Sequence, residues 1–245
     1  MWLVFDVGNS SIKGGLFDGS RLDRTFDLTH DAAAERLDTV LDGREIECAG
    51  IASVVPGSAE RLSRLLSSRD LHVTEVRHTM HLPFEMAYRT PETLGTDRIA
   101  AAAAAWVLYG GEGRNVVAID AGTAFTCEVI DRHGVYHGGT IGPGPALMQR
   151  ALHSETAQLP DVPLEVPDSP VGRSTVEAMQ AGVMYGFIDS VQGLLRRIRR
   201  TLDGETVVVA TGGWSRILCD HLEGVEAADA HLVLRGVRIL MSLNG

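Results

Sequence analysis

The sequence predicts an α/β fold with mixed β-sheets, organised as two similar halves. The main observation is a motif that occurs twice, each time directly after an apolar run typical of a buried strand. Asp6–Ser10 (Asp-Val-Gly-Asn-Ser) follows Trp2–Phe5, and Asp120–Ala124 (Asp-Ala-Gly-Thr-Ala) follows Val116–Ile119. A second observation is that a similar order of predicted strands and helices follows each motif. Strands and helices in this order indicate mixed sheets flanked by helices.

The first half begins with three predicted strands and continues with helices and strands in alternation. Strands are expected at Trp2–Asp6, Ser11–Phe17, Arg21–Leu28, Cys48–Val54 and His72–Val76. Helices are expected at Asp31–Leu41, Glu60–Ser67 and Arg98–Tyr109, with an irregular loop over His78–Leu94. Glycines at Gly110–Gly113 end the last of these helices, so we place a domain boundary there. The chain then divides into an N-terminal domain of residues 1–113 and a C-terminal domain of residues 114–245.

The second half repeats this order. Strands are expected at Val116–Ile119, Thr126–Ile130, Val135–His137 and Thr206–Ala210, and a helix at Ala146–His153. Four prolines between Pro160 and Pro170 favour an extended loop. A long helix is predicted over Thr175–Arg200, because Ser174 and Glu177 form a capping-box pattern at its start. Two further helices are expected between Thr211–Gly213 and the end of the sequence.

Composition and charge favour a cytoplasmic protein without nucleic-acid or membrane partners. The 245 residues carry a net charge of -10, which disfavours binding to nucleic acid or an anionic membrane. A basic run near Arg196–Arg200 is explained by the end of the long helix, where cations complement the helix dipole. Three widely spaced cysteines predict neither disulfides nor a zinc site. An early acid, Asp6, is unlike a signal peptide, and the apolar run Ile99–Tyr109 is too short to span a bilayer.

The two Asp-x-Gly turns have the residue types of a phosphate-binding site. Gly8 and Gly122 lack a Cβ atom, so the backbone can approach a phosphate closely. Asp6 and Asp120 stand at strand ends, where their carboxylates can face a cation. The side chains that could bind phosphate oxygens are those of Asn9, Ser10, Ser11, Lys13 and Thr123. One such turn would be interpreted as a simple tight turn, but two in register indicate a nucleotide site between the halves.

Two other nucleotide-binding motifs are missing from the sequence. There is no Gly-x-x-x-x-Gly-Lys-(Ser/Thr) segment, which excludes a P-loop kinase. No Gly-x-Gly-x-x-Gly follows the first strand, which excludes a dinucleotide-binding site of that type. Gly212, after the predicted strand Thr206–Ala210, is a third point of close backbone approach and suits the ribose or adenine end of a nucleotide.

The segment Leu94–Arg98 (Leu-Gly-Thr-Asp-Arg) admits two interpretations. In the first, Thr96 or Asp97 caps the alanine-rich helix, where an acid interacts favourably with the helix dipole. In the second, the free N–H groups from Gly95 to Asp97 and the Arg98 side chain form an anion site. Asp97 would then lie beside a bound acceptor and take its hydroxyl proton, as phosphoryl transfer to an alcohol requires.

The ordered set of motifs resembles the type III pantothenate kinases, bacterial enzymes of coenzyme A synthesis. The resemblance runs through Asp6–Ser10, Ser53–Pro56, Gly95–Arg98, Asp120–Thr126, Gly138–Gly144, Thr156–Pro160 and Thr211–Gly213. It implies two tandem actin-like (ribonuclease-H-like) domains in a homodimer, with MgATP bound between the domains. It also implies ATP-dependent phosphorylation of pantothenate to 4'-phosphopantothenate.

The resemblance assigns roles to individual residues. ATP phosphates would be held by Asp6, Gly8, Asn9, Ser10, Ser11, Lys13, Gly122 and Thr123, with Gly212 near the nucleoside. Asp6 would face Mg²⁺, and Asp120 would bind a monovalent cation, K⁺ or NH₄⁺. Pantothenate would be bound by Tyr88, Gly95, Thr96, Asp97, Arg98 and Thr175, with Asp97 as the general base. The chain departs from the family pattern at Ser10, Cys127-Glu128 and Ser174, where Thr, Phe-Asp and Asn are common.

Two other functions remain open at this point. The same scaffold could serve as a non-catalytic ATP-binding transcriptional accessory factor, because a fold does not determine function. It could also be an actin-like kinase with another small hydroxyl acceptor, such as a sugar, although the short chain leaves little room for a sugar-binding insertion. Gly182 and Gly186 form a flat stripe on the long helix that would suit a homodimer contact, or packing within one chain.

Overall fold

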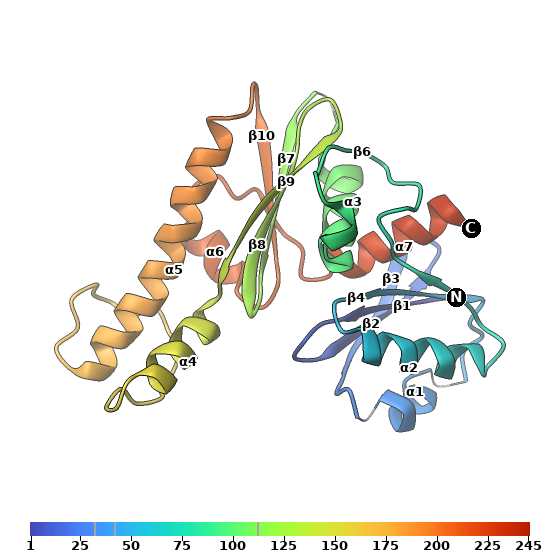
Figure 1. The fold of residues 1–245 in the computed structure, drawn as a ribbon, viewed down its shortest axis with the longest axis horizontal. Helices are drawn as coiled ribbons and strands as arrows, with labels where there is room; N and C mark the ends of the chain where they lie inside the picture. Colours follow the sequence, from blue (N-terminus) through green and yellow to red (C-terminus); the bar gives the residue numbers. More distant parts are fainter. Residues whose placement is uncertain (32, 42, 112) are drawn as a thin grey trace.

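The computed structural model describes residues 1–31, 33–41, 43–111 and 113–245, and the side chains of residues 33–35 lie outside this description. The described chain forms two β-sheets with helices packed on their faces (Figure 1). The predicted α/β class with mixed sheets is therefore confirmed. Among the described residues, no helix has both the length and the apolar character needed to cross a lipid bilayer.

The first sheet has the strand order β3-β2-β1-β4-β5. Its strands are β1 (Trp2–Val7), β2 (Ile12–Asp18), β3 (Arg21–Leu28), β4 (Cys48–Ser53) and β5 (His72–Glu75). Strand β1 is antiparallel to β2 and parallel to β4. The alternating side chains Leu3, Phe5 and Val7 of β1 pack in a core with helices α1 (Ala33–Leu41) and α2 (Pro56–Ser67). Val4 points to the opposite face and packs in the core that contains α3 (Thr96–Tyr109) and α7 (Leu232–Asn244), so both faces of β1 are covered and the strand reads as a continuous apolar run.

The second sheet has the order β11-β10-β7-β8-β9-β6. Its strands are β6 (Glu85–Met86), β7 (Asn115–Ala121), β8 (Ala124–Ile130), β9 (Val135–Pro143), β10 (Thr206–Thr211) and β11 (Ala227–Ala228). One face packs on α5 (Thr175–Arg199) and α6 (Ser215–His221) through apolar residues such as Phe125, Phe187 and Leu218. Helix α4 (Pro145–Glu155) and the start of α5 extend beyond the sheet as an arm (Figure 1).

The predicted elements are found in order, with corrections at β6, β9 and α2 and one strand, β11, that was not expected. The segment His78–Leu94 was expected to be an irregular loop, but it contains β6, which pairs in parallel with β9, and a short 3₁₀ turn at Pro91–Thr93. Strand β9 continues past His137 to Pro143, because its glycine-rich end pairs with β8 over its whole length. Helix α2 begins four residues earlier than predicted, with Pro56 in its first turn. Ala32 and Glu112, within the predicted helix and boundary, lie outside the described residues.

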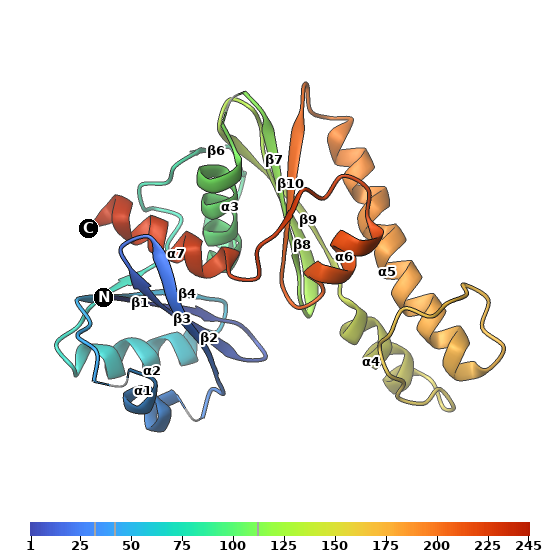
Figure 2. The same cartoon turned by 180° about the vertical axis from the view of Figure 1, so that it is seen from behind.

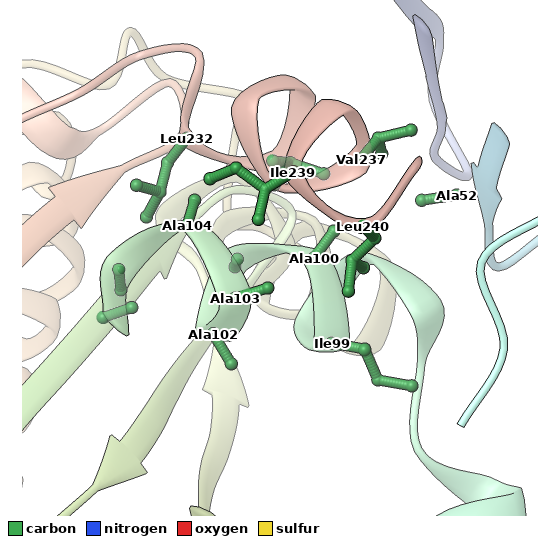
Figure 3. Close-up of a cluster of buried hydrophobic side chains, with 14 of the residues drawn as sticks. Ala52, Ile99, Ala100, Ala102, Ala103, Ala104, Leu232, Val237, Ile239 and Leu240 are labelled. Carbon is green, nitrogen blue, oxygen red and sulfur yellow. The ribbon is translucent and has the colours of Figure 1, made fainter. Parts of the chain in front are cut away.

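Helices α3 (Thr96–Tyr109) and α7 (Leu232–Asn244) lie side by side between the two sheets, as both overall views show (Figures 1 and 2). The alanines of α3 are buried, and small side chains let the helices come close (Figure 3). A Cβ atom at Gly236 would lie 1.8 Å from the carbonyl oxygen of Ala100. The apolar character of α3 therefore reflects burial on several sides.

The two halves exchange elements across the proposed boundary. Helix α7, from the second half, also packs on β1 and β4 of the first sheet. Strand β6, from the first half, forms the edge of the second sheet. The division at residues 113 and 114 stays a prediction.

Candidate active site

The two Asp-x-Gly turns meet at one cavity of about 220 Å³ between the sheets. The predicted site residues that line it are Asp6, Gly8, Asn9, Ser10, Ser11, Lys13, Asp97, Arg98, Asp120, Gly122, Thr123 and Gly212. The cavity is also lined by Val54, Ala101, Ala124, Thr126 and Gly213, which the sequence analysis did not single out as site residues. Segments far apart in the sequence thus converge at the ends of β1, β7 and β10 and the start of α3.

The first turn connects β1 to β2 and is closed by a hydrogen bond from the Gly8 N–H to the Ser11 carbonyl oxygen at 3.1 Å. In the second turn, the Gly122 N–H donates to the Ala124 carbonyl oxygen at 3.0 Å. The hydroxyl oxygens of Ser10 and Thr123 lie 3.3 Å apart in a hydrogen bond. The two turns therefore face each other directly, as expected for the two sides of a phosphate site.

Gly212 can come close to the second turn because it has no side chain. Its φ of 84° lies in the left-handed region, which favours glycine. A Cβ atom at this position would lie 2.5 Å from Oδ1 of Asp120 and 2.6 Å from the Ala121 carbonyl oxygen. The Trp214 N–H donates to that same carbonyl at 3.0 Å and holds the loop after β10 in place.

The N-terminus of α3 is attached to the end of β4. The Thr96 hydroxyl donates to the Ser53 carbonyl oxygen at 2.9 Å and accepts from the Ser53 N–H at 2.6 Å. The N-cap residue is Gly95, and no side chain caps this helix. Neither Thr96 nor Asp97 is the N-cap residue, and the Thr96 hydroxyl is used by the sheet, but Asp97 does place its acid in the first turn, as that interpretation expected. Asp97 lies in the first turn of the helix, where its Oδ1 accepts from the Arg98 N–H at 2.8 Å.

Arg98 forms a buried ion pair with Glu128 of β8. Arg98 Nε and Nη2 donate to the two carboxylate oxygens of Glu128 at 2.7 and 2.9 Å. The Tyr136 hydroxyl donates to Glu128 Oε2 at 2.6 Å. Burial disfavours the charged form of Arg98, but the hydrogen bond and charge of Glu128 outweigh it and raise the arginine's pKa above its ordinary value. Two of the five N–H donors of Arg98 are thus already used, and its role toward an acceptor stays a prediction.

Three carboxyl groups share the cavity with one lysine. Burial, helped by the charges of Asp97 and Asp120, raises the pKa of Asp6 to about 7. Burial also raises the pKa of Asp120 to about 6, although Lys13 acts in the opposite direction. The pKa of Asp97 is raised by burial as well, with its hydrogen bond from Arg98 opposing the shift. A bound cation would relieve this crowding of negative charge.

Asp6 and Asp120 could each bind a cation that a bound ligand also coordinates. Among the described residues, no group of three or more His, Cys, Asp or Glu side chains is arranged to hold a metal ion alone. Asp6 and Asp120 supply the hard oxygen donors that Mg²⁺ and K⁺ prefer, and phosphate oxygens would complete the coordination. The donor set therefore fits the predicted Mg²⁺ and monovalent cation.

Four predicted acceptor residues do not line this cavity. Gly95 and Thr96 lie next to it, in the segment that positions Asp97. Tyr88 borders another hollow together with His137 and Gly139, and its ring lies 6.1 Å from the ring of Tyr136. Thr175 is exposed at the start of α5.

Glu128 and Tyr136 were not identified as site residues from the sequence. One signal was available, because Glu128 is a single acid inside the apolar run from Ala124 to Ile130, where an unpaired charge would be costly. Its partner Arg98 is 30 positions away in the sequence, so only the folded chain identifies the pair.

Solved structures of other proteins share this fold. A Campylobacter jejuni structure, named as a conserved Baf family transcriptional activator, aligns with a TM-score of 0.63 at 22% identity over 98% of this chain and 97% of that one. A ROK family glucokinase from Streptomyces griseus, in complex with glucose and AMPPNP, aligns with a TM-score of 0.50 at 16% identity, covering 96% and 97%. This chain therefore has the fold of these proteins, in agreement with the predicted actin-like (ribonuclease-H-like) architecture.

Sequence relatives give the family among proteins with this fold. The family model for type III pantothenate kinase matches residues 2–197. A type III pantothenate kinase from Chlorobaculum parvum is 36% identical over 99% of this chain and 94% of its own length. Another from Moorella thermoacetica is 34% identical over the full length of both chains. The chain belongs to the type III pantothenate kinase family and is a kinase, and this membership supports ATP as the phosphoryl donor.

Proposed function

We propose that this kinase transfers the γ-phosphoryl group of ATP to the primary hydroxyl of pantothenate, which yields 4'-phosphopantothenate and ADP in the first step of coenzyme A synthesis. The observation that carries the proposal is that Asp97 lines the same cavity as both phosphate-type turns. A carboxylate beside the transferred group can orient the acceptor hydroxyl and take its proton.

The residues divide the work of binding ATP. The backbone N–H groups of Asn9 to Ser11 and the hydroxyls of Ser10, Ser11 and Thr123 bind phosphate oxygens, and Lys13 adds positive charge. Gly8, whose own N–H closes the first turn, lets the backbone approach the phosphates. Gly212 leaves room for the nucleoside end. Asp6 would hold Mg²⁺ and Asp120 the monovalent cation. When bound, these cations would neutralise the negative charge that develops on the phosphates.

The acceptor is placed at the N-terminus of α3. Gly95 and Thr96 supply backbone N–H groups, Arg98 supplies charge for the pantothenate carboxylate, and Tyr88 closes the far side. Asp97 accepts the hydroxyl proton while the hydroxyl oxygen attacks the γ-phosphorus and the bond to the β–γ bridging oxygen breaks. ADP leaves with the electrons of that bond, and the proton on Asp97 passes to solvent.

A homodimer is part of the proposal. Besides the family resemblance, it is supported by exposed apolar side chains on the arm formed by α4, α5 and the loop between them, at Leu147, Leu152, Val171 and Val176. Exposed apolar groups of this kind are typical of protein contact surfaces. We assign Thr175, which begins α5, to the acceptor site only within such a dimer.

The direct test is ADP release by the purified protein with ATP and Mg²⁺, with and without pantothenate, in K⁺ and in Na⁺. Release that depends on pantothenate and is faster in K⁺ is expected, and a panel of sugars in place of pantothenate should give none. A protein that binds ATP but releases no ADP in either salt would contradict the proposal and favour a non-catalytic regulator. Release with a sugar instead would identify a different acceptor.

A further inference from the structure

Glu128 is a buried acid that the proposed chemistry does not use. Its side chain is 1% exposed, and that of its partner Arg98 is 9% exposed. Removing a carboxylate from water is costly, and the cost is offset only by close partners with good geometry. The partners of Glu128 meet this requirement, since Arg98 donates to both oxygens of the carboxylate and Tyr136 donates a third hydrogen bond.

Glu128 is connected to both sides of the proposed acceptor site. On one side, its partner Arg98 follows Asp97 directly, and the Arg98 N–H donates to the Asp97 carboxylate at 2.8 Å. On the other side, its partner Tyr136 packs against Tyr88, with ring centres 6.1 Å apart and planes at 57°. Glu128 thus contacts Arg98 and Tyr136 directly, and it is connected to Asp97 through Arg98 and to Tyr88 through Tyr136.

The first turn of α3 has two attachments. Thr96 bonds to the backbone of Ser53 in the first sheet. Arg98 bonds to Glu128 in the second sheet. Asp97 lies between these two anchor points in the sequence, so its position depends on both. Without Glu128, the long arginine side chain would keep its charge but lose the partner that fixes its direction.

We propose that Glu128 is a positioning residue for the acceptor: it holds the Arg98 guanidinium in one orientation and thereby fixes the direction of the charge that meets the acceptor. It touches neither ATP nor the acceptor itself. The inference rests on the proposed function, because it assumes that Arg98 faces an anionic acceptor.

Two substitutions separate the charge of Glu128 from its volume. Glu128→Gln keeps the shape but removes the negative charge and puts an N–H₂ group against donors. Glu128→Asp keeps the charge and shortens the side chain by one methylene, which the flexible arginine can follow. If Glu128 positions Arg98 through its charge, Gln is the more harmful change. If Glu128 only fills space, Asp is the more harmful one.

The experiment measures kcat and the KM values for pantothenate and ATP. For Glu128→Gln we expect the pantothenate KM to rise by about 10–100-fold, the effect of losing a charge-assisted hydrogen bond, with an unchanged ATP KM. Glu128→Asp should stay within about threefold of the wild type. Asp229→Asn is the matched control, since it also removes a carboxylate that pairs with an arginine. Asp229 Oδ2 lies 2.9 Å from Arg235 Nε, and Asp229 does not line the cavity. It should leave both KM values unchanged.

A second measurement does not need turnover. Phenylglyoxal modifies accessible arginines, and peptide mass spectrometry reports the rate at Arg98. Labelling should be slow in the wild type and in Glu128→Asp, and faster in Glu128→Gln. If Glu128→Gln does not fold, as thermal melts would show, Tyr136→Phe decides the question. That variant removes one hydrogen bond to Glu128 and should raise the pantothenate KM by about 2–5-fold.

The outcomes distinguish this inference from the proposed function. A wild type that turns over pantothenate, together with wild-type KM and labelling in Glu128→Gln, would overturn the positioning role and leave the function intact. A Glu128→Asp variant more impaired than Glu128→Gln would overturn it as well. A wild type without turnover would defeat the proposed function, while the labelling rates at Arg98 would still test whether Glu128 restrains the guanidinium.

Discussion

Asp6 shows how burial at the cavity makes the stability of the fold depend on pH. The pKa of Asp6 is raised from 3.8 to about 7, mainly by burial. The folded state therefore holds this proton more tightly than the unfolded state between about pH 4 and pH 7. Over that window stability falls as the pH rises, and above it the full destabilising effect of the buried charge remains.

Asp6→Asn should accordingly stabilise the protein without ligands at high pH. At pH 8 we expect a rise in Tm of at least about 2–4 °C, the shift that ~1 kcal/mol produces in a protein of this size. At pH 4, where the wild-type carboxyl is protonated in the folded state, the two proteins should melt alike. Calorimetry at both pH values checks this, and an equal Tm shift at both would contradict the electrostatic explanation.

Asp97 is the residue on which the proposed chemistry depends most. Asp97→Asn should fold and bind ATP normally but lose about 10²–10⁴-fold in kcat, the usual cost of removing a general base. Burial raises the pKa of Asp97. The wild-type kcat should therefore rise with pH as this carboxyl loses its proton, and the midpoint of that rise should lie at a higher pH than the pKa of an ordinary Asp. ADP release across pH tests both points, and near-wild-type turnover of Asp97→Asn would exclude its assignment as base.

At the scale of elements, the start of α3 is built so that Asp97 has room. A Cβ atom at Gly95 would lie 2.5 Å from Asp97 Oδ1. The φ of Gly95 is -56°, so alanine is acceptable to the backbone. We expect Gly95→Ala to displace the carboxylate and reduce kcat by about 10–100-fold, as small misplacements of a catalytic group do. Its Tm should be close to that of the wild type, and a normal kcat would show that the carboxylate has another position that works.

The contact between α3 and α7 depends on a second glycine for a different reason. At Gly236 a Cβ atom would overlap the backbone of Ala100, which cannot move alone. Gly236→Ala should destabilise the protein by about 1–3 kcal/mol, the range for overpacking. Gly193→Ala in α5 is the control, because nothing lies within 4 Å of its added methyl. Urea unfolding of both variants tests the prediction, and equal stability would mean that the two helices can separate at little cost.

At the scale of the whole molecule, we expect the arm formed by α4 and α5 to be the contact surface of a homodimer. Size-exclusion chromatography with light scattering should give twice the 26.3 kDa of one chain. Val176→Glu would place a charge on an apolar side chain that is 40% exposed, and it should weaken the dimer without lowering the Tm of the monomer. Val107→Glu, on an apolar residue of α3 that is 48% exposed, is the control. A monomeric wild type at micromolar concentration would count against the dimer.

Local patterns in the sequence were sufficient for most of the secondary structure. The strands at Trp2–Asp6 and Val116–Ile119 were predictable because their apolar runs are short and end in Asp-x-Gly turns. The long helix was predictable from Ser174 and Glu177, and its cap is present, with the Glu177 N–H donating to the Ser174 hydroxyl at 3.2 Å. Strand β6 was not predictable, since only two residues pair with β9 and their local sequence has no periodicity.

The sequence by itself determined the α/β class, the two turns and the family, because these depend on neighbouring residues and on the order of motifs. Only the tertiary structure decided that Thr96 ties α3 to Ser53 rather than capping the helix, and that Arg98 is paired with Glu128. It also decided that Tyr88 and Thr175 lie outside the cavity that holds Asp97. The physical reason is that burial and pairing across long sequence separations depend on how the two sheets meet around α3 and α7, which no local pattern encodes.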